Sequence, residues 1–206
     1  SALFSGQADH IIFSRVVLTP PEAEMIAITN PTDASINLSN YYLTDATDSP
    51  NSYYFNLTTG GNYWSENVRD FIVNFPDTTI DSGDTLIIAM KTSEEFLEYY
   101  DYPPHFALGD GDLPDAVEGE STIGSGANIP GFGMLSDNIE TLILFYWDGI
   151  STTVQDVDYF LWDYFNYDEN NLVAHPMAIN KDNVEGYLLD TPVEQQSYIR
   201  KHGSDS

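Results

Sequence analysis

Short runs of apolar and β-branched residues, separated by turn residues, recur along this chain. Three of them stand out: Ile11 to Leu18, which ends at Pro20 and Pro21, Thr85 to Met90, and Thr141 to Trp147. Runs of this length, bounded by Gly, Pro, Asn or Asp, are typical of β-strands. Further strands are expected at 25–28, 36–38, 41–43, 53–55 and 71–73. The pattern therefore predicts an all-β fold, with repeated short strands that favour a β-sandwich.

One stretch has the pattern of a helix instead, at residues 92–100. Thr92 and Ser93 are candidate N-caps, acidic residues follow in the first turn, and Phe96 and Tyr100 are four positions apart. Pro103 and Pro104 follow it. The sequence thus predicts one short helix in an otherwise β-rich chain.

Two long segments read as loops. Residues 45–67 are rich in Asn, Thr and Gly, and residues 109–133 are rich in Gly. Loops this long in a compact domain are usually functional or mobile. A tight hairpin is expected at Asp148-Gly149, because this pair favours the two-residue turn between antiparallel strands. Val154, Val157 and Tyr159 would then lie on the return strand.

The charge balance narrows the possible partners. Six Lys and Arg face 33 Asp and Glu, a formal net charge of -27. Nucleic-acid binding depends on basic side chains that neutralise phosphates, and anionic membranes also attract basic surfaces, so both are disfavoured as partners. Repulsion among the carboxylates opposes compaction unless salt screens it or cations bind. The composition indicates a saline or calcium-rich environment, or acidity that serves only solubility.

The sequence lacks the residues, or the residue spacing, that several classes of functional site require. The chain has no Cys, which excludes disulfides, thiolate metal sites and thiol catalysis. The four histidines, His10, His105, His175 and His202, are far apart and lack zinc-site spacing. Carboxylates are so abundant that any spacing between pairs carries no signal for glycoside hydrolysis. No apolar run approaches the ~20 residues of a membrane helix. We therefore expect a protein that is not an enzyme and has no transmembrane segment.

One acidic loop is a candidate calcium site. Calcium prefers oxygen ligands and suits flexible acidic loops. The spacing is not that of an EF-hand, and a solvated acidic loop is the alternative interpretation. The candidate metal ligands are Asp110, Asp112, Asp115, Glu118 and Glu120.

Aromatic residues are dense in the later part of the chain. The run from Phe160 to Phe165 is too continuous for a strand with one wet face, so some rings are expected to point outward and to stack on sugars or anchor a protein partner. Packing in the core is the alternative. The candidate contact residues are Trp162, Tyr164, Phe165 and Tyr167.

The order of these elements resembles the lamin-tail domain family. The matching pieces are the opening strand at 11–17, Glu24 to Asn30, Ile36 to Asp45, the glycine turn and strand from Ile80 to Ala89, and the stretches at 135–144 and 148–159. Ala27 replaces an expected acidic residue, and Asn138-Ile139 stands where the family often has a glycine. The resemblance covers roughly residues 10–160.

This resemblance implies an immunoglobulin-like β-sandwich without catalytic residues. It makes residues 1–206 one lamin-tail-like domain, with a core at about 10–160 and a C-terminal extension at 161–206. Asp190 to Val193 followed by Gln196 is similar to an extension in some bacterial members. The polar ending from Lys201 to Ser206 is typical of a linker, so we expect a module of a longer protein.

Two functional hypotheses follow. The first is a secreted or cell-surface adhesion or scaffolding module that binds a protein, a glycan or another copy of itself. The second is a carbohydrate-binding or carbohydrate-active β-sandwich. An open aromatic groove faced by two carboxylates would favour the second. A third possibility is a calcium-stiffened scaffold, which differs from the first hypothesis only in requiring the metal.

Overall fold

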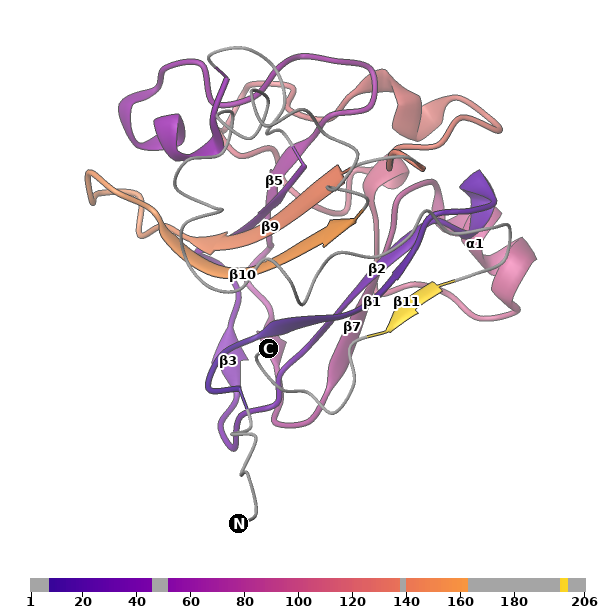
Figure 1. The fold of residues 1–206 in the computed structure, drawn as a ribbon, viewed down its shortest axis with the longest axis horizontal. Coiled ribbons are helices and arrows are strands. Elements are labelled where there is room, and N and C mark those ends of the chain that lie inside the picture. Colours follow the sequence, from indigo (N-terminus) through magenta and orange to yellow (C-terminus); the bar gives the residue numbers. More distant parts are fainter. Residues whose placement is uncertain (1–7, 46–51, 138–139, 163–196, 200–206) are drawn as a thin grey trace.

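The computed structural model describes residues 8–45, 52–137, 140–162 and 197–199 (Figure 1). It consists mostly of strands in sheets, which confirms the predicted all-β class. The larger sheet has five strands in the order β11-β1-β2-β7-β8. Its members are β1 (Ile12–Val17), β2 (Met25–Thr29), β7 (Thr85–Ala89), β8 (Phe106–Ala107) and β11 (Ser197–Ile199).

The second sheet has four strands in the order β10-β9-β4-β5, and a two-stranded sheet pairs β3 with β6. All pairings in these two sheets are antiparallel, whereas β8 pairs with β7 in parallel. The strands are β3 (Ile36–Asn37), β4 (Tyr41–Thr44), β5 (Ile72–Asn74), β6 (Thr79–Ile80), β9 (Glu140–Tyr146) and β10 (Gln155–Trp162).

One hydrophobic core joins the two larger sheets. It contains Ile26 and Ile28 of β2 together with Leu142 and Leu144 of β9, all fully buried. Successive strand residues point to opposite faces, so Ile143 and Phe145 of β9 belong to a second, outer cluster. The four-stranded sheet is thus covered on both faces, which explains why β9 is an uninterrupted apolar run.

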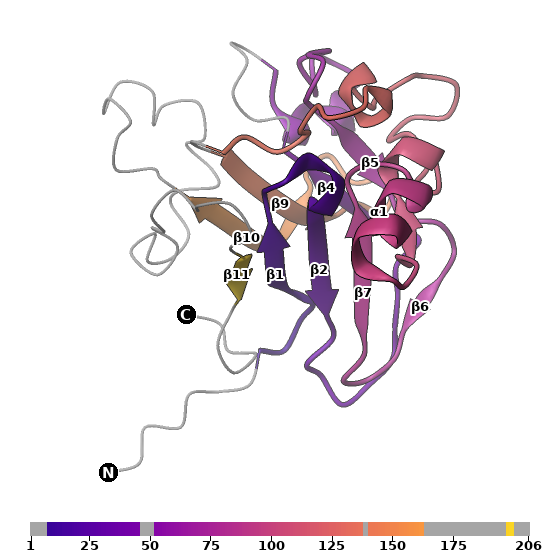
Figure 2. The same ribbon diagram turned by 90° about the vertical axis from the view of Figure 1, so that its right-hand side faces the viewer.

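Helix α1 (Ser93–Tyr100) confirms the predicted helix (Figure 2). Thr92 is its N-cap, and its hydroxyl accepts a hydrogen bond from the Glu95 backbone N–H while the Glu95 carboxylate accepts one from the Thr92 N–H. Phe96 is buried against the larger sheet. The helix ends at Asp101, whose φ of 61° is left-handed.

Two local predictions are wrong. Residues 53–55 do not form a strand: a 3-10 helix, η2 (Tyr54–Thr59), begins there, because burying Tyr54 and Leu57 follows a period of three. The hairpin between β9 and β10 is not a two-residue turn, because the return strand begins only at Gln155, after Val154. Hydrogen bonds to the Asp148 side chain stabilise a longer loop there.

The glycine-rich segment packs against the edge of the four-stranded sheet. It contains the 3-10 helices η3 (Leu108–Asp110) and η4 (Ser125–Asn128), and a third, η1 (Pro21–Ala23), precedes β2. Single β-bridges join Phe71 to Ile123 and Val73 to Asp115. These contacts make the predicted loop a covering layer over β5.

Strands that lie at or beyond the end of the predicted core also belong to the sheets. Strand β10 continues past residue 160 to Trp162, and β11, from the predicted extension, pairs with β1 through Arg15 and Ile199. Strand β11 is therefore an edge strand of the larger sheet, next to β1. Among the described residues, no helix is long and apolar enough to cross a membrane.

Candidate functional site

The loop between β9 and β10 projects at the left of Figure 1 and is held by side-chain hydrogen bonds. The Asp148 carboxylate accepts hydrogen bonds from the backbone N–H groups of Ile150 (2.9 Å) and Ser151 (2.7 Å), and from the Ser151 hydroxyl (2.7 Å). These bonds lower the pKa of Asp148. Gly149 adopts a φ of 77°, which suits a residue without a side chain. The loop is thus fixed from within.

Neighbouring groups tie the same loop to the rest of the molecule. The Trp147 indole N–H donates to the Ser151 carbonyl at 2.8 Å, and the Thr58 hydroxyl donates to the Thr152 carbonyl at 3.2 Å. Thr58 belongs to η2, so the loop and the 52–66 segment support each other. We name residues 147–152 the hairpin tip.

The hairpin tip exposes one large apolar side chain. Ile150 is 88% exposed, more than any other large hydrophobic residue in the described part of the chain. None of the three hydrophobic clusters includes it. Burying an Ile side chain is worth about 1.5–3 kcal/mol. The loop therefore holds a side chain in water that could contribute this free energy on contact with an apolar surface.

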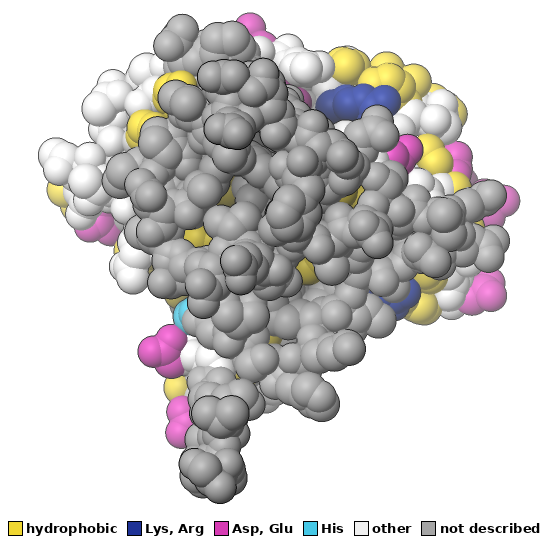
Figure 3. Space-filling model, viewed as in Figure 1, with side chains coloured by type: hydrophobic (Ala, Val, Ile, Leu, Met, Phe, Trp, Pro, Cys, Tyr) yellow, Lys and Arg dark blue, Asp and Glu magenta, His cyan; other side chains and the backbone are white. Residues whose placement is uncertain are grey.

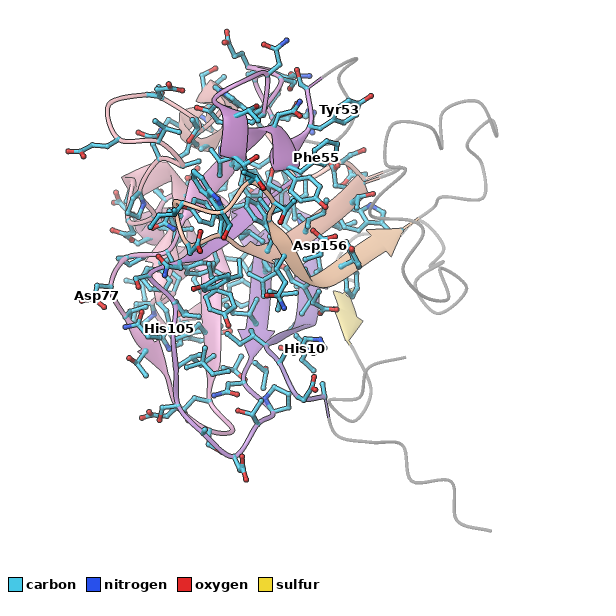
Figure 4. All side chains as sticks on the ribbon, turned by 90° about the vertical axis from the view of Figure 1, so that its left-hand side faces the viewer. His10, Tyr53, Phe55, Asp77, His105 and Asp156 are labelled. Carbon is cyan, nitrogen blue, oxygen red and sulfur yellow. The ribbon has the colours of Figure 1, made fainter. Side chains whose placement is uncertain are left out.

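Beside the hairpin tip lies a half-buried aromatic surface. Tyr53 and Phe55 stack with their ring centroids 5.2 Å apart and their planes 5° from parallel. Tyr53, Phe55 and Asp156 lie on the same side of the molecule (Figure 4). Phe55, Trp64, Trp147 and Tyr159 pack on the outer cluster while remaining partly exposed. These rings offer aromatic area to a ligand.

A carboxylate is fixed within this surface. Asp156 accepts hydrogen bonds from the hydroxyl of Tyr54 at 2.7 Å and of Tyr159 at 2.6 Å. Burial, together with the charge of Asp156, raises the pKa of Tyr54, so this hydroxyl stays protonated and remains a donor. Asp156 is thus a hydrogen-bond acceptor that two tyrosine hydroxyls hold in place.

The predicted calcium ligands do not converge. Asp110 accepts from the N–H and hydroxyl of Ser93, Asp112 from the N–H of Ala107, and Asp115 from the N–H and hydroxyl of Thr122. Glu120 accepts from the Tyr63 hydroxyl, and Glu118 is exposed. Among the described residues, no group of three or more His, Cys, Asp or Glu side chains could hold a metal ion. The carboxylates instead organise separate parts of the loop.

Trp162 does not face outward as predicted. Its side chain is 0% exposed, belongs to the inner core, and donates its indole N–H to the Ser136 carbonyl at 2.9 Å. Tyr159, with the opposite orientation in β10, contributes to the outer cluster. A register shift between Asp156 and Asp158 helps to set this alternation. The other predicted contact residues, Tyr164, Phe165 and Tyr167, lie outside the described residues.

Two buried charges that the sequence did not single out hold the 124–135 segment. The Lys91 ammonium donates to the carbonyls of Gly126 (2.7 Å), Ile129 (2.6 Å) and Phe132 (3.1 Å). The Glu24 carboxylate accepts from the N–H of Met134 at 2.6 Å. Burial lowers the pKa of Lys91 and raises that of Glu24. The sequence signal that could have identified Lys91 and Glu24 is that each is a charged residue next to an apolar stretch.

Three further carboxylates approach one another at the start of β9. Burial, and then the charges of Glu140 and Asp70, raise the pKa of Asp45. The Asp45 carboxylate accepts from the Phe71 backbone N–H at 2.7 Å, which joins the end of β4 to the start of β5. This arrangement supports the sheet.

The comparisons with known proteins give a structural neighbour at a low TM-score. No family model matches the chain, and no curated protein matches it. A solved structure of a DUF4876 family protein from Bacteroides thetaiotaomicron VPI-5482 is similar, with 13% sequence identity and a TM-score of 0.41. The match covers 74% of this chain and 53% of that protein, so this chain spans about half of its length.

Proposed function

We propose that this chain is a non-enzymatic adhesion or scaffolding module, secreted or held at a cell surface, with an immunoglobulin-like sandwich of lamin-tail type. One observation carries the proposal: an internally hydrogen-bonded loop holds Ile150 almost wholly in water. A large apolar side chain at a fixed loop tip gains free energy when another protein surface buries it. The partner is therefore a protein with an apolar pocket.

Pre-organisation makes this geometry effective for binding. Association costs free energy when loops and side chains must be ordered at the interface. Here Asp148, Trp147 and Thr58 have already ordered the loop. Ile150 would act as an anchor, and the half-exposed rings beside it would exclude water around the anchor.

A carbohydrate-binding role is the second candidate. The parallel Tyr53 and Phe55 rings and the fixed Asp156 acceptor favour it, because aromatic faces stack on sugar rings and carboxylates accept their hydroxyl groups. The two candidates depend on different central residues. A protein ligand should depend on Ile150, and a glycan should depend on Phe55.

The experiment separates them by variant. The full chain is used to select binders from a displayed peptide library and is also applied to a glycan array. Ile150→Ser should abolish binding of the selected peptides, while Val68→Ser, at a residue 37% exposed, should leave it unchanged. Phe55→Ala should abolish any glycan binding. Peptides that bind both Ser variants equally would overturn the protein-binding role of the hairpin tip.

A further inference from the structure

The C-terminal end of α1 carries a second exposed aromatic surface, on the opposite side of the molecule from the hairpin tip (Figure 1). Leu97, Tyr99 and Tyr102 are 46%, 41% and 38% exposed. Glu98 and Asp101 lie among them and are also exposed. We name these five residues the acidic tyrosine patch. At the right-hand rim of Figure 3, near the place of α1 in Figure 1, apolar and acidic side chains lie close together, with a basic side chain beside them.

The rings of this patch are held by a buried scaffold. Tyr102 packs edge-on against the buried Phe96 at 5.7 Å, and Tyr99 packs edge-on against Tyr100 at 4.9 Å. Tyr100 in turn contacts Phe96 at 4.5 Å and donates its hydroxyl to the Ala23 carbonyl at 3.0 Å. The exposed rings thus rest on inner rings that are fixed to the larger sheet.

The two charged residues within the patch, Glu98 and Asp101, are both acidic. The C-terminus of a helix has a partial negative charge, and a basic residue there would be stabilising. The last turn of α1 has none, and Glu98 and Asp101 add negative charge instead. The patch therefore presents electron-rich ring faces within a negative field. Arg15, which acts electrostatically on Tyr100, is the one basic side chain known to act on the rings in the described part of the chain.

We propose that the acidic tyrosine patch is a docking surface for an arginine-rich polypeptide segment. A guanidinium group stacks on aromatic faces and pairs with carboxylates, and it is more weakly hydrated than an ammonium group. Tyr99 and Tyr102 supply the faces, Glu98 and Asp101 supply the carboxylates, and Leu97 supplies apolar area for the side-chain stems. This surface is independent of the hairpin tip and of the function proposed for it.

The test uses a peptide of six arginines and its six-lysine counterpart, titrated into the full chain in 150 mM NaCl. Tyr99→Ser combined with Tyr102→Ser should weaken binding of the arginine peptide about tenfold, through loss of two stacked contacts. Glu98→Gln combined with Asp101→Asn should weaken it while leaving every ring in place. The matched control, Asp33→Asn with Glu118→Gln, removes the same charge from exposed sites elsewhere.

Three results support the proposal together. The arginine peptide binds more tightly than the lysine peptide. The protein amides whose NMR shifts change when the arginine peptide is added are confined to residues 92–105. The control variant binds the peptide as the parent does. Equal losses in the control and patch variants, or shifts spread over the surface, would mean a general attraction of cations to an acidic protein and would overturn it. Equal affinity for both peptides would overturn the stacking. Circular dichroism verifies that each variant is folded.

Discussion

The Glu24 carboxylate accepts a hydrogen bond from the Met134 backbone N–H at 2.6 Å, across 110 positions of the chain. Glu24 is 1% exposed and lies directly before β2, whereas Met134 closes the glycine-rich segment. The same carboxylate also accepts from the Leu135 N–H at 3.4 Å. One buried acid therefore fixes the long covering layer to the start of a core strand.

This acid makes stability depend on pH. Burial raises the pKa of Glu24 well above its usual value of 4.5, so its contribution is fully present below that value and is lost as pH rises through the pKa of the folded state. We expect the free energy of unfolding to fall as pH rises above the usual Glu value of 4.5. Glu24→Gln should flatten this dependence in urea unfolding at constant ionic strength. Glu118→Gln, at an exposed site, is the control and should keep it.

Lys91 is the second support of the same segment. Lys91→Met removes the ammonium group and leaves three carbonyl oxygens without their donor, so we expect a loss of about 3 kcal/mol. The control is Arg69→Met, which removes an exposed cation whose guanidinium lies 4.4 Å from the Phe132 ring centroid and should cost about 0.5–1 kcal/mol. Urea unfolding measures both. Equal losses would contradict the role of Lys91.

Long-range contacts such as these could not be predicted from the sequence. Local signals predicted α1 correctly, because the Thr92 cap, Glu95 and Phe96 lie within one turn of each other. The burial of β9 on both faces was also readable from its continuous apolar run. The partner of Glu24 was not readable, because no local pattern links it to Met134.

The sequence also did not predict to which face of the sheet the side chains of β10 point. Trp162 and Tyr159 belong to the same strand, and a one-residue change in register exchanges the faces of a sheet. The predicted exposure of Trp162 depended on that register, which pairing with β9 and the shift near Asp156 set in the structure. The prediction of a tight hairpin was also wrong, because the Asp148 side chain accepts hydrogen bonds from N–H groups of a longer loop.

Glycines in the covering layer are expected to be intolerant of substitution. A Cβ at Gly124 would lie 2.4 Å from the Val68 carbonyl oxygen and 2.6 Å from that of Asn67, and backbone cannot move aside cheaply. Gly124→Ala should therefore destabilise the protein by about 2–3 kcal/mol in urea unfolding. Gly61→Ala, whose nearest neighbour is a movable Thr59 hydroxyl at 3.3 Å, is the control and should cost less. A tolerated Gly124→Ala would mean that the layer is not tightly packed there.

Calcium should act on this protein as an ordinary divalent cation. The candidate ligands bind separate partners, while a net charge of -27 makes any screening cation stabilising. We expect calcium and magnesium to raise the melting temperature equally, in parent and in Asp112→Asn alike. A calcium-specific rise that Asp112→Asn removes would instead restore the predicted site.

The order of the hairpin tip can be measured directly. Asp148→Ala removes the acceptor of the Ile150 and Ser151 amides, so both should exchange hydrogen with solvent faster than in the parent. Ile150→Ser should leave their exchange unchanged, because the Ile150 side chain is almost wholly exposed and contributes nothing to the fold of the loop. Amide exchange followed by NMR distinguishes the two roles. If Ile150→Ser also accelerated exchange, the side chain would support the loop, and its availability as a binding anchor would have to be abandoned.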